Sequence, residues 1–205
     1  MRTITHMLTR RLGALFGGLL DRLHGRGRGP AKGREVYGEV RVRLYDMHEV
    51  REAIPEWDAL DNAQRLDTLH EYGPAPYREV QTTNVTLNDM HTHEAQYWDV
   101  NSTTSNLDGS HVALGTDDTA PDATDTSLGS EQYRTTVDDS TVNGRDLETA
   151  TLLNENEGNT HTYEEIGLVT AGTGGTFLNR ADLDSVDKDD QTAAEFEVFL
   201  EFRPA

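Results

Sequence analysis

One segment constrains the fold of this chain more than any other: residues 163–182, which read YEEIGLVTAGTGGTFLNRAD. The alternating apolar positions Ile166 and Leu168 indicate a half-buried strand that runs into a glycine-rich turn at 171–175. Glycine adopts the positive φ angles that a tight reversal needs, so the segment predicts a β-hairpin. It does not predict a phosphate-binding loop, because no Lys-Ser or Lys-Thr pair follows the glycines and no helical pattern begins after them.

The last segment of the chain has the cleanest alternation of apolar and polar residues, and it predicts a strand at 194–203. Strand patterns are also expected at 96–100, 111–115, 133–137, 147–153, 160–169 and 176–183. Consecutive strands with short turns and one polar face are typical of antiparallel sheets. We therefore expect a mainly β chain, with an antiparallel β-sandwich domain over 96–205 that is preceded by an N-terminal amphipathic helix and a short helix-plus-strand segment.

The charge of the chain is strongly uneven along its length. The formal net charge is −19, and only two of the 205 residues are lysines. Residues 1–34 hold eight basic residues and one acidic residue, a charge of +7, which leaves −26 on residues 35–205. An acidic, lysine-poor surface is typical of proteins that work in near-molar salt, where the Debye length falls to about 3 Å. The alternative is an ordinary acidic mesophilic protein.

The composition also excludes several kinds of site. The chain has no cysteine, which excludes disulfides, thiolate catalysis and cysteine metal sites. The field of the acidic body would repel phosphate, so we do not expect the body to bind nucleic acid. No stretch approaches the roughly 20 apolar residues of a membrane-spanning helix, and a membrane partner is not expected.

The N-terminal residues 1–24 have the pattern of a basic amphipathic helix, which a Gly/Arg linker at 25–35 follows. Its apolar face and its neighbouring charges include Leu8, Leu12, Leu15, Phe16, Leu19, Leu20, Arg10 and Arg11. Three functions compete: a docking arm for a partner or a sister subunit, a helix on a membrane surface, and a twin-arginine-like export signal. We favour the docking arm, because the positive charge suits an acidic neighbour. The helix could also pack on its own domain.

Residues 36–95 are expected to form a strand–helix–strand connecting region, with strands at 36–44 and 80–87 and a helix at 58–72. Asp89, His91 and His93 follow the second strand. If they continue a strand, their side chains share a face and could bind one metal ion. A turn with solvated histidines explains the segment equally well.

Three elements of the C-terminal half resemble a known family when they are taken in order. Residues 112–121 read VALGTDDTAP, a Leu-x-x-Glu-x-x-Arg element follows, and then comes the hairpin at 165–180. This order resembles the small β-domains of tailed-virus virion structural proteins, over roughly residues 110–203. The matching positions are Leu114, Gly115, Leu128, Glu131, Arg134, Glu165, Gly167, Gly174, Gly175 and Arg180. The chain departs from the pattern at Val169-Thr170.

The resemblance implies a non-enzymatic virion component of a haloarchaeal tailed virus, assembled in the host cytoplasm as a symmetric oligomer. The partners it implies are other virion proteins and copies of this chain, with the host surface as a further candidate, and no cofactor is expected. Related proteins are tail-fibre, baseplate or capsid-surface components, and we favour the tail or baseplate over a capsid decoration. An exported haloarchaeal cell-surface binding protein is the alternative from another class.

The charged residues of this motif have two interpretations. Glu131, Arg134, Glu165 and Arg180 could be a catalytic set, or they could be partly buried charges that pair across strands and fix their register. No Ser-His-Asp order and no glycine-framed nucleophile accompanies them. We therefore expect the structural role, and we expect no catalytic residue.

Overall fold

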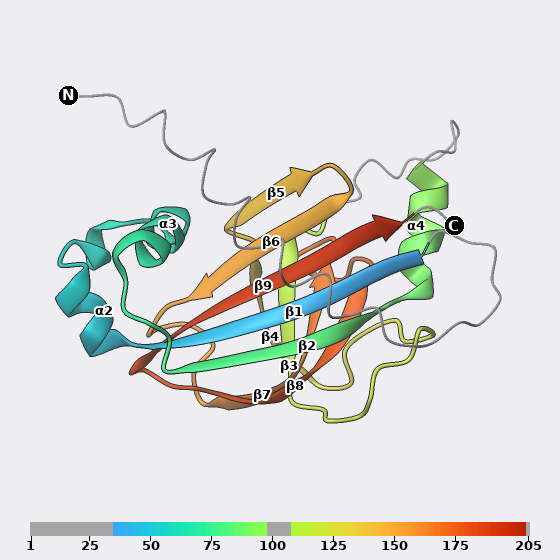
Figure 1. Ribbon diagram of the computed structural model, residues 1–205. Helices are drawn as coiled ribbons and strands as arrows, with labels where there is room; N and C mark the ends of the chain where they lie inside the picture. Colours follow the sequence, from blue (N-terminus) through green and yellow to red (C-terminus); the bar gives the residue numbers. More distant parts are fainter. Residues whose placement is uncertain (1–34, 98–107, 204–205) are drawn as a thin grey trace. The chain divides into compact units, whose positions relative to one another are not determined.

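The computed structural model describes residues 35–97 and 108–203 (Figure 1). The amphipathic helix expected at 1–24, and nearly all of the linker expected at 25–35, lie outside the described residues. The described chain runs through β1 (Glu35–Asp46), α2 (Met47–Ala53), the 3-10 helix η2 (Trp57–Ala59), α3 (Asn62–Tyr72), β2 (Arg78–Thr86), α4 (Asn88–Tyr97), β3 (His111–Gly115), β4 (Glu131–Thr136), β5 (Asp139–Asn143), β6 (Asp146–Leu153), β7 (His161–Val169), β8 (Asn179–Lys188) and β9 (Thr192–Arg203).

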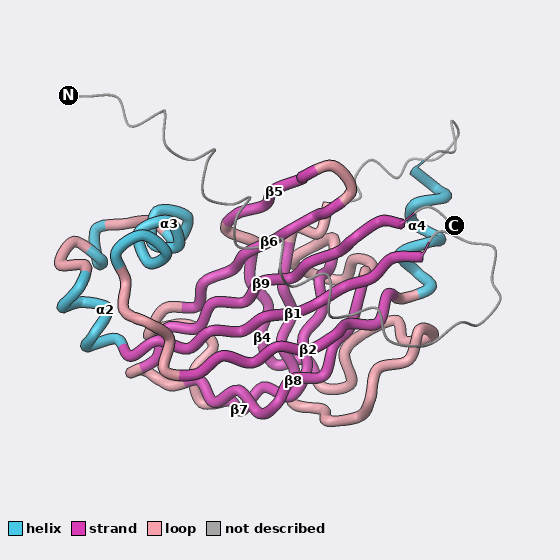
Figure 2. Tube along the Cα trace, in the orientation of Figure 1, coloured by secondary structure: helices cyan, strands magenta, loops and turns pink. Residues whose placement is uncertain are grey.

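The strands form a single nine-stranded antiparallel sheet in the order β4-β3-β7-β8-β2-β1-β9-β6-β5. The sheet is strongly curled, like half of a barrel (Figure 2). The expected mainly β class is confirmed, but the expected two-sheet sandwich is wrong. Alternation along a strand shows that one face is buried. It does not show whether a second sheet covers that face or whether the sheet curls over it, and here the sheet curls.

The region at 36–95 supplies two strands of the middle of this sheet. β1 pairs with β9 along its whole length, from Glu35 opposite Arg203 to Asp46 opposite Thr192. β2 pairs with β1 on one side and with the start of β8 on the other. The strands on either side of the boundary expected at 95/96 therefore belong to one sheet.

The main core lies on one face of the curled sheet. Val40 and Val42 of β1 stand opposite Val198 and Phe196 of β9, and all four side chains are buried. Further residues of β1 and β9, of β2, β3, β6, β7 and β8, of α4 and of the segment just before β8 complete the cluster: Leu44, Val80, Met90, Val112, Leu114, Leu153, Tyr163, Ile166, Leu168, Leu178, Ala181, Leu183, Val186, Ala194 and Leu200. Burial of this continuous apolar face is the main favourable term for the fold.

A second core forms where α2 and α3 pack at one end of the sheet, on its other face. Trp57 is fully buried there, with Met47 and Val50 of α2 and Leu66 and Leu69 of α3. Both helices have side-chain caps: Asp46 accepts hydrogen bonds from two backbone amides of α2, and Asp61 and Gln64 form a capping box on α3. The helix expected at 58–72 is confirmed from residue 62 onward.

The segment that follows β2 is helix α4, and the strand considered for it is wrong. The buried Leu87 and Met90 anchor its first turn, and the amide of Asn88 donates to the carbonyl of Ala123. A strand was expected at 96–100, but residues 96 and 97 are the last two residues of helix α4. Residues 98–100 lie outside the described residues. Among the described residues, no helix combines the length and the hydropathy that crossing a membrane would require.

We expect Phe196→Ala to lower the free energy of unfolding by about 3–5 kcal/mol, because it opens a cavity in the main core. Tyr72→Ala is the matched control, since Tyr72 is exposed at the end of α3, and it should change stability by no more than about 0.5 kcal/mol. Denaturant titration of both variants measures the difference. Similar losses in the two variants would contradict this assignment of the buried face.

Candidate functional site

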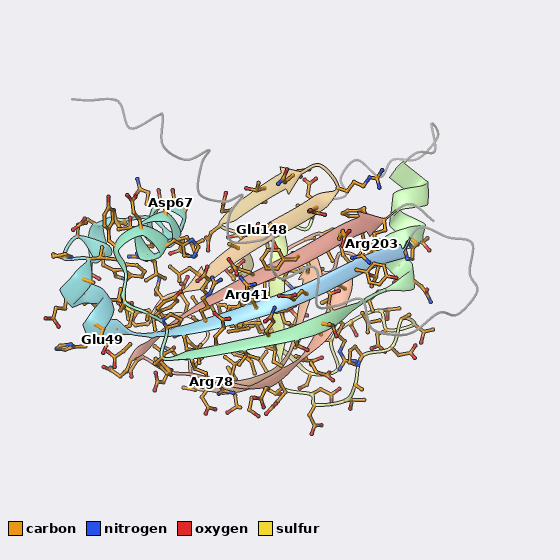
Figure 3. The ribbon with its side chains drawn as sticks, viewed as in Figure 1. Arg41, Glu49, Asp67, Arg78, Glu148 and Arg203 are labelled. Atoms are coloured by element: carbon orange, nitrogen blue, oxygen red, sulfur yellow. The ribbon has the colours of Figure 1, made fainter. Side chains whose placement is uncertain are left out.

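The face of β1 and β9 opposite the main core carries charged side chains. Arg43 is paired directly with Glu195, and Arg41 with Glu197. Directly paired residues of antiparallel strands project from the same face, so the four charges form one cluster. Figure 3 shows Arg41 and also Glu148, which extends the charged face onto β6.

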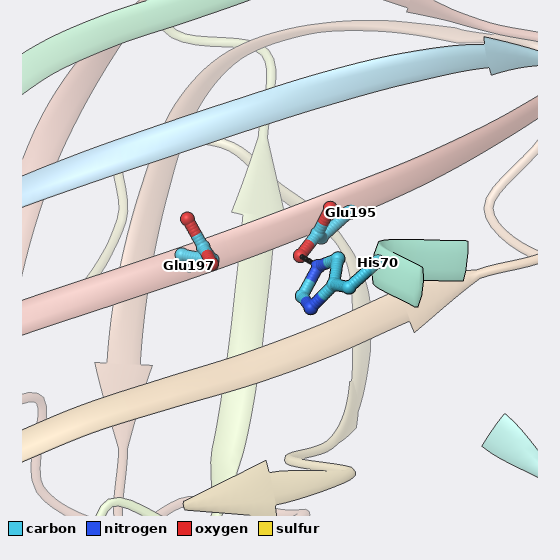
Figure 4. A group of neighbouring side chains, drawn as sticks. All are labelled: His70, Glu195 and Glu197. Carbon is cyan, nitrogen blue, oxygen red and sulfur yellow. Dashed lines mark hydrogen bonds and ion pairs between the residues drawn. The ribbon is translucent and has the colours of Figure 1, made fainter. Parts of the chain in front are cut away.

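Glu195 is the centre of this cluster, and its side chain is fully buried. The carboxylate accepts a hydrogen bond from the Tyr45 hydroxyl at 2.9 Å and lies 3.1 Å from Nη1 of Arg43. It also lies 2.5 Å from Nε2 of His70 on α3 (Figure 4). Burial alone would raise the pKa of Glu195, but the hydrogen bond and charge of His70, with Arg43 and Tyr45, lower it overall.

Glu197 lies two residues further along β9 and shares the same arginines. Its carboxylate is 3.0 Å from Nη2 of Arg43 and 3.3 Å from Nη1 of Arg41. Burial and the neighbouring charge of Glu195 raise the pKa of Glu197 in spite of these ion pairs. The Arg41 guanidinium also lies over the ring of Phe199, 5.4 Å from its centroid.

His70 connects this cluster to helix α3. Its hydrogen bond to Glu195 raises the pKa of the imidazole above its ordinary value, although burial acts in the opposite direction. The side chain of His70 is 45% exposed, so the proton exchanges with solvent directly. When it is protonated, the imidazole holds α3 against β9 through a charge-assisted hydrogen bond.

The cluster also has the residue types of a metal site. Ligand atoms of His70, Glu195 and Glu197 lie within 4.8 Å of one another, the only such group found in the described part of the chain. However, Arg43 contacts both carboxylates, and the imidazole nitrogen already bonds to Glu195. Because a guanidinium and an imidazole already contact these carboxylates, the geometry is that of an ion-pair network.

A second buried network joins β7 and β8 to the acidic loop at 116–130. Glu165 is fully buried and accepts hydrogen bonds from the amides of Gly129 at 3.0 Å and Ser130 at 2.8 Å. Nε of Arg180, diagonally across the strand pair, donates to it at 2.9 Å. A side chain at Gly115 would collide with the Glu165 carboxylate, so the close approach of β3 requires glycine there.

Arg180 uses its remaining nitrogens to hold the acidic loop. Nη1 lies 2.7 Å from a carboxylate oxygen of Asp125, and Nη2 lies 3.2 Å from Asp117 and 3.0 Å from the carbonyl of Thr119. The Arg180 side chain is almost fully buried by these contacts. One arginine therefore connects three acidic side chains, which would repel one another without it.

A third set of contacts secures the glycine turn at 171–175. Nη1 of Arg134 donates to the carbonyls of Ala171 and Gly174, both at 2.7 Å. Its guanidinium also pairs with Glu131 at 2.6 Å and lies over the ring of Phe177, 5.2 Å from the centroid. Gly174 has a φ of +64°, as expected for a residue of a tight reversal.

The structure thus brings the family-motif residues of the sequence analysis together around the hairpin. Leu114 is in the main core, and Leu128 packs in a small cluster with Phe177. Gly167 faces the ring of Phe177 too closely for a side chain, and Gly175 has a φ of +80°. Glu165 and Arg180 pair between strands as expected, whereas Glu131 and Arg134 lie three residues apart on the same strand, β4.

The structure does not support the geometry considered for Asp89, His91 and His93. All three belong to α4, where residues two apart point about 200° away from each other. His91 is exposed, and the side chain of His93 lies outside the described residues. The residues of the docking arm, from Leu8 to Leu20, also lie outside the described range.

Sequence reasoning missed the cluster around Glu195. A signal was present, because Arg41 and Arg43 alternate on one strand and Glu195 and Glu197 alternate on another. Because arginines and glutamates attract each other across neighbouring strands, this complementary pattern predicts that β1 and β9 are neighbours. The contribution of His70 depends on where α3 docks, and no local pattern carries that information.

Comparison with known protein families, with curated proteins and with solved structures finds no match to this chain.

We expect Arg180→Met to destabilise the protein by about 3–5 kcal/mol, because it leaves the buried Glu165 carboxylate without its counter-ion. Arg78→Met is the control: Arg78 forms an ion pair with Asp184 and donates to the exposed carbonyls of Asp184 and Ser185, and its loss should cost no more than about 1 kcal/mol. Denaturant unfolding measures both. Equal effects would contradict the role of Arg180 in holding the acidic loop.

The His70–Glu195 contact should make stability depend on pH. The pKa of His70 is higher in the folded protein than in the unfolded chain, where it is about 6.5. The contribution of the His70–Glu195 contact to folding stability is therefore complete below about pH 6.5 and is lost as the pH rises through the folded pKa. His70→Gln should therefore lower the melting temperature most in mildly acidic solution and progressively less at higher pH. Parallel melting curves at every pH for the two proteins would be inconsistent with this contact.

Proposed function

We propose that this protein is a non-enzymatic structural component of a halophilic archaeal tailed virus particle. The observation that carries the proposal is the convergence of the family-motif residues. Glu165, Arg180, Arg134 and Glu131 form contacts that hold a glycine turn and an acidic loop in place around one hairpin. This is what a structural motif requires: residues that define the shape of a surface.

The chemistry of these residues favours architecture over catalysis. A general acid or base needs a proton that can be exchanged with a substrate. The Glu165 carboxylate is buried, and backbone amides and Arg180 surround it. Arg134 is similarly occupied by two turn carbonyls and Glu131.

The charge distribution supports the halophilic setting. Residues 35–205 carry −26, and ordered arginine ion pairs hold the acidic segments that lie close together. In near-molar salt the remaining repulsion between surface carboxylates is screened within about 3 Å. Such a body remains soluble and stable in the medium in which a haloarchaeal virus must persist.

The basic N-terminal arm gives the body a means of attachment. Its +7 charge and its apolar residues, from Leu8 to Leu20, suit a groove on an acidic neighbouring virion protein or on another copy of this chain. We place the protein at the tail or baseplate, as a fibre-attachment component that assembles as a symmetric oligomer. A turret or spike on the capsid of the same kind of virus is the second location.

We expect deletion of residues 1–24 to leave a folded, soluble protein that no longer enters virus particles, because the sheet and its cores lie in residues 35–203. Quantitative mass spectrometry of purified particles measures incorporation. Leu12→Lys with Phe16→Lys should also abolish it, since this variant increases the positive charge but interrupts the apolar face. Arg10→Lys with Arg11→Lys is the control and should incorporate normally. Normal incorporation of the deletion variant would refute the docking role.

A further inference from the structure

β5 is the last strand of the sheet, and its outer side pairs with no described strand. It forms the outer edge of the β5–β6 hairpin at the top of Figure 1. All five of its residues are exposed, and the side chain of Val142 reaches 73%. Open edge strands are templates for pairing with another chain, which is why many proteins cover or charge them. Here only one residue of the strand, Asp139, is charged.

The hairpin turn decides which backbone groups face outward. A two-residue turn, Gly144-Arg145, joins Asn143 to Asp146, and Gly144 has a φ of +68°. In such a turn the flanking residues exchange hydrogen bonds with each other. Alternation then directs the amide and carbonyl groups of Val142 and Ser140 away from β6, toward the open edge.

The two ends of this edge carry opposite charges. Asp139 begins β5, and the exposed Arg145 stands in the turn just beyond its end. Neither side chain has an ion-pair partner among the described residues. A strand with a negative charge at one end and a positive charge at the other is complementary to an antiparallel copy of itself.

We propose that β5 pairs with β5 of a second copy, antiparallel and around a two-fold axis at Val142. In this register Val142 stands opposite its own counterpart, so two exposed apolar side chains meet. The turn that holds the partner's Arg145 lies just beyond the end of the ladder at which Asp139 begins, so the long Arg145 side chain can reach Asp139, and the symmetry generates the same ion pair twice. The outward-facing amide and carbonyl of each Val142 exchange hydrogen bonds, and the two sheets become continuous.

This β5 interface adds a specific contact to the proposed assembly role, and the choice of a high-salt medium for it rests on that proposed role. The high negative charge of the body opposes association at low salt, and near-molar salt screens that repulsion. The dimer should therefore be measured in the salty medium that the composition suits.

The absence of cysteine allows a direct test of the register on the full-length chain. Val142→Cys should form a disulfide-linked dimer on mild oxidation, since paired Cα atoms lie about 5.5 Å apart, within the range that a disulfide spans. Thr141→Cys is the control, because its counterpart would lie diagonally, about 7–8 Å away. Rapid cross-linking of Val142→Cys alone supports the register. Cross-linking of Thr141→Cys in preference, or of neither variant, overturns it.

A charge exchange tests the ion pairs independently. Asp139→Arg and Arg145→Asp should each weaken the dimer by about threefold, because each creates two repulsive pairs that near-molar salt screens only in part, and the double exchange should restore it. Sedimentation equilibrium measures the dissociation constants. Asp139→Arg lowers the net negative charge, so a non-specific charge effect would strengthen association instead. That result, or a failure of the double variant to restore the dimer, overturns the proposal.

These experiments separate the interface from the wider function. A wild-type chain that is monomeric in near-molar salt, yet present in particles, would overturn β5 self-pairing and leave the virion role intact. Hydrogen exchange could instead show that the β5 amides are protected in particles while the purified protein stays monomeric. That result would assign the β5 edge to a different virion protein and would also overturn self-pairing. A β5-paired dimer that is absent from particles would support the interface and refute the virion role.

Discussion

The pairing of β1 with β9 is the interaction on which the rest of the structure depends. The ladder runs the full length of β1, and its two faces have opposite character. One face carries Val40, Val42 and Phe196 into the main core, and the other carries Arg43 against Glu195. A slip of one residue would place the charges in the core and the apolar side chains outside, so the register has no close competitor.

Both charge networks use cations to position segments that lie outside the main core. Arg180 connects the acidic loop to β7 and β8, and His70 connects α3 to β9. In a chain with so few cations, each buried arginine offsets repulsion between several carboxylates as well as forming its own ion pair. The networks therefore position segments of the fold with residue types that also occur in catalytic and metal sites.

Much of the strand content could be predicted from the sequence, because alternation reports directly on a half-buried strand. The hairpin at 163–182 and the strand at 194–203 were identified in this way, and they correspond to β7, β8 and β9. β5 was missed because all of its residues are exposed, so it has no apolar alternation to detect. That same property makes it a candidate interface.

Other features depend on tertiary structure and could not be obtained from local patterns. The alternation of apolar residues is the same in a sandwich and in a sheet that curls over its own core, so the architecture was expected incorrectly. The segment containing His91 has strand-like spacing, yet it is helical because Leu87 and Met90 anchor its first turn. The partners of Glu195 come from three separate elements, and only their packing brings them together.

The most direct test of the structural role is an electron cryomicroscopy map of purified virus particles. We expect density for the curled nine-stranded sheet, repeated about a symmetry axis at the tail or baseplate and connected to a neighbouring protein at its N-terminal side. Particles that contain no copy of this chain, while the protein fractionates with the host cell envelope, would contradict it.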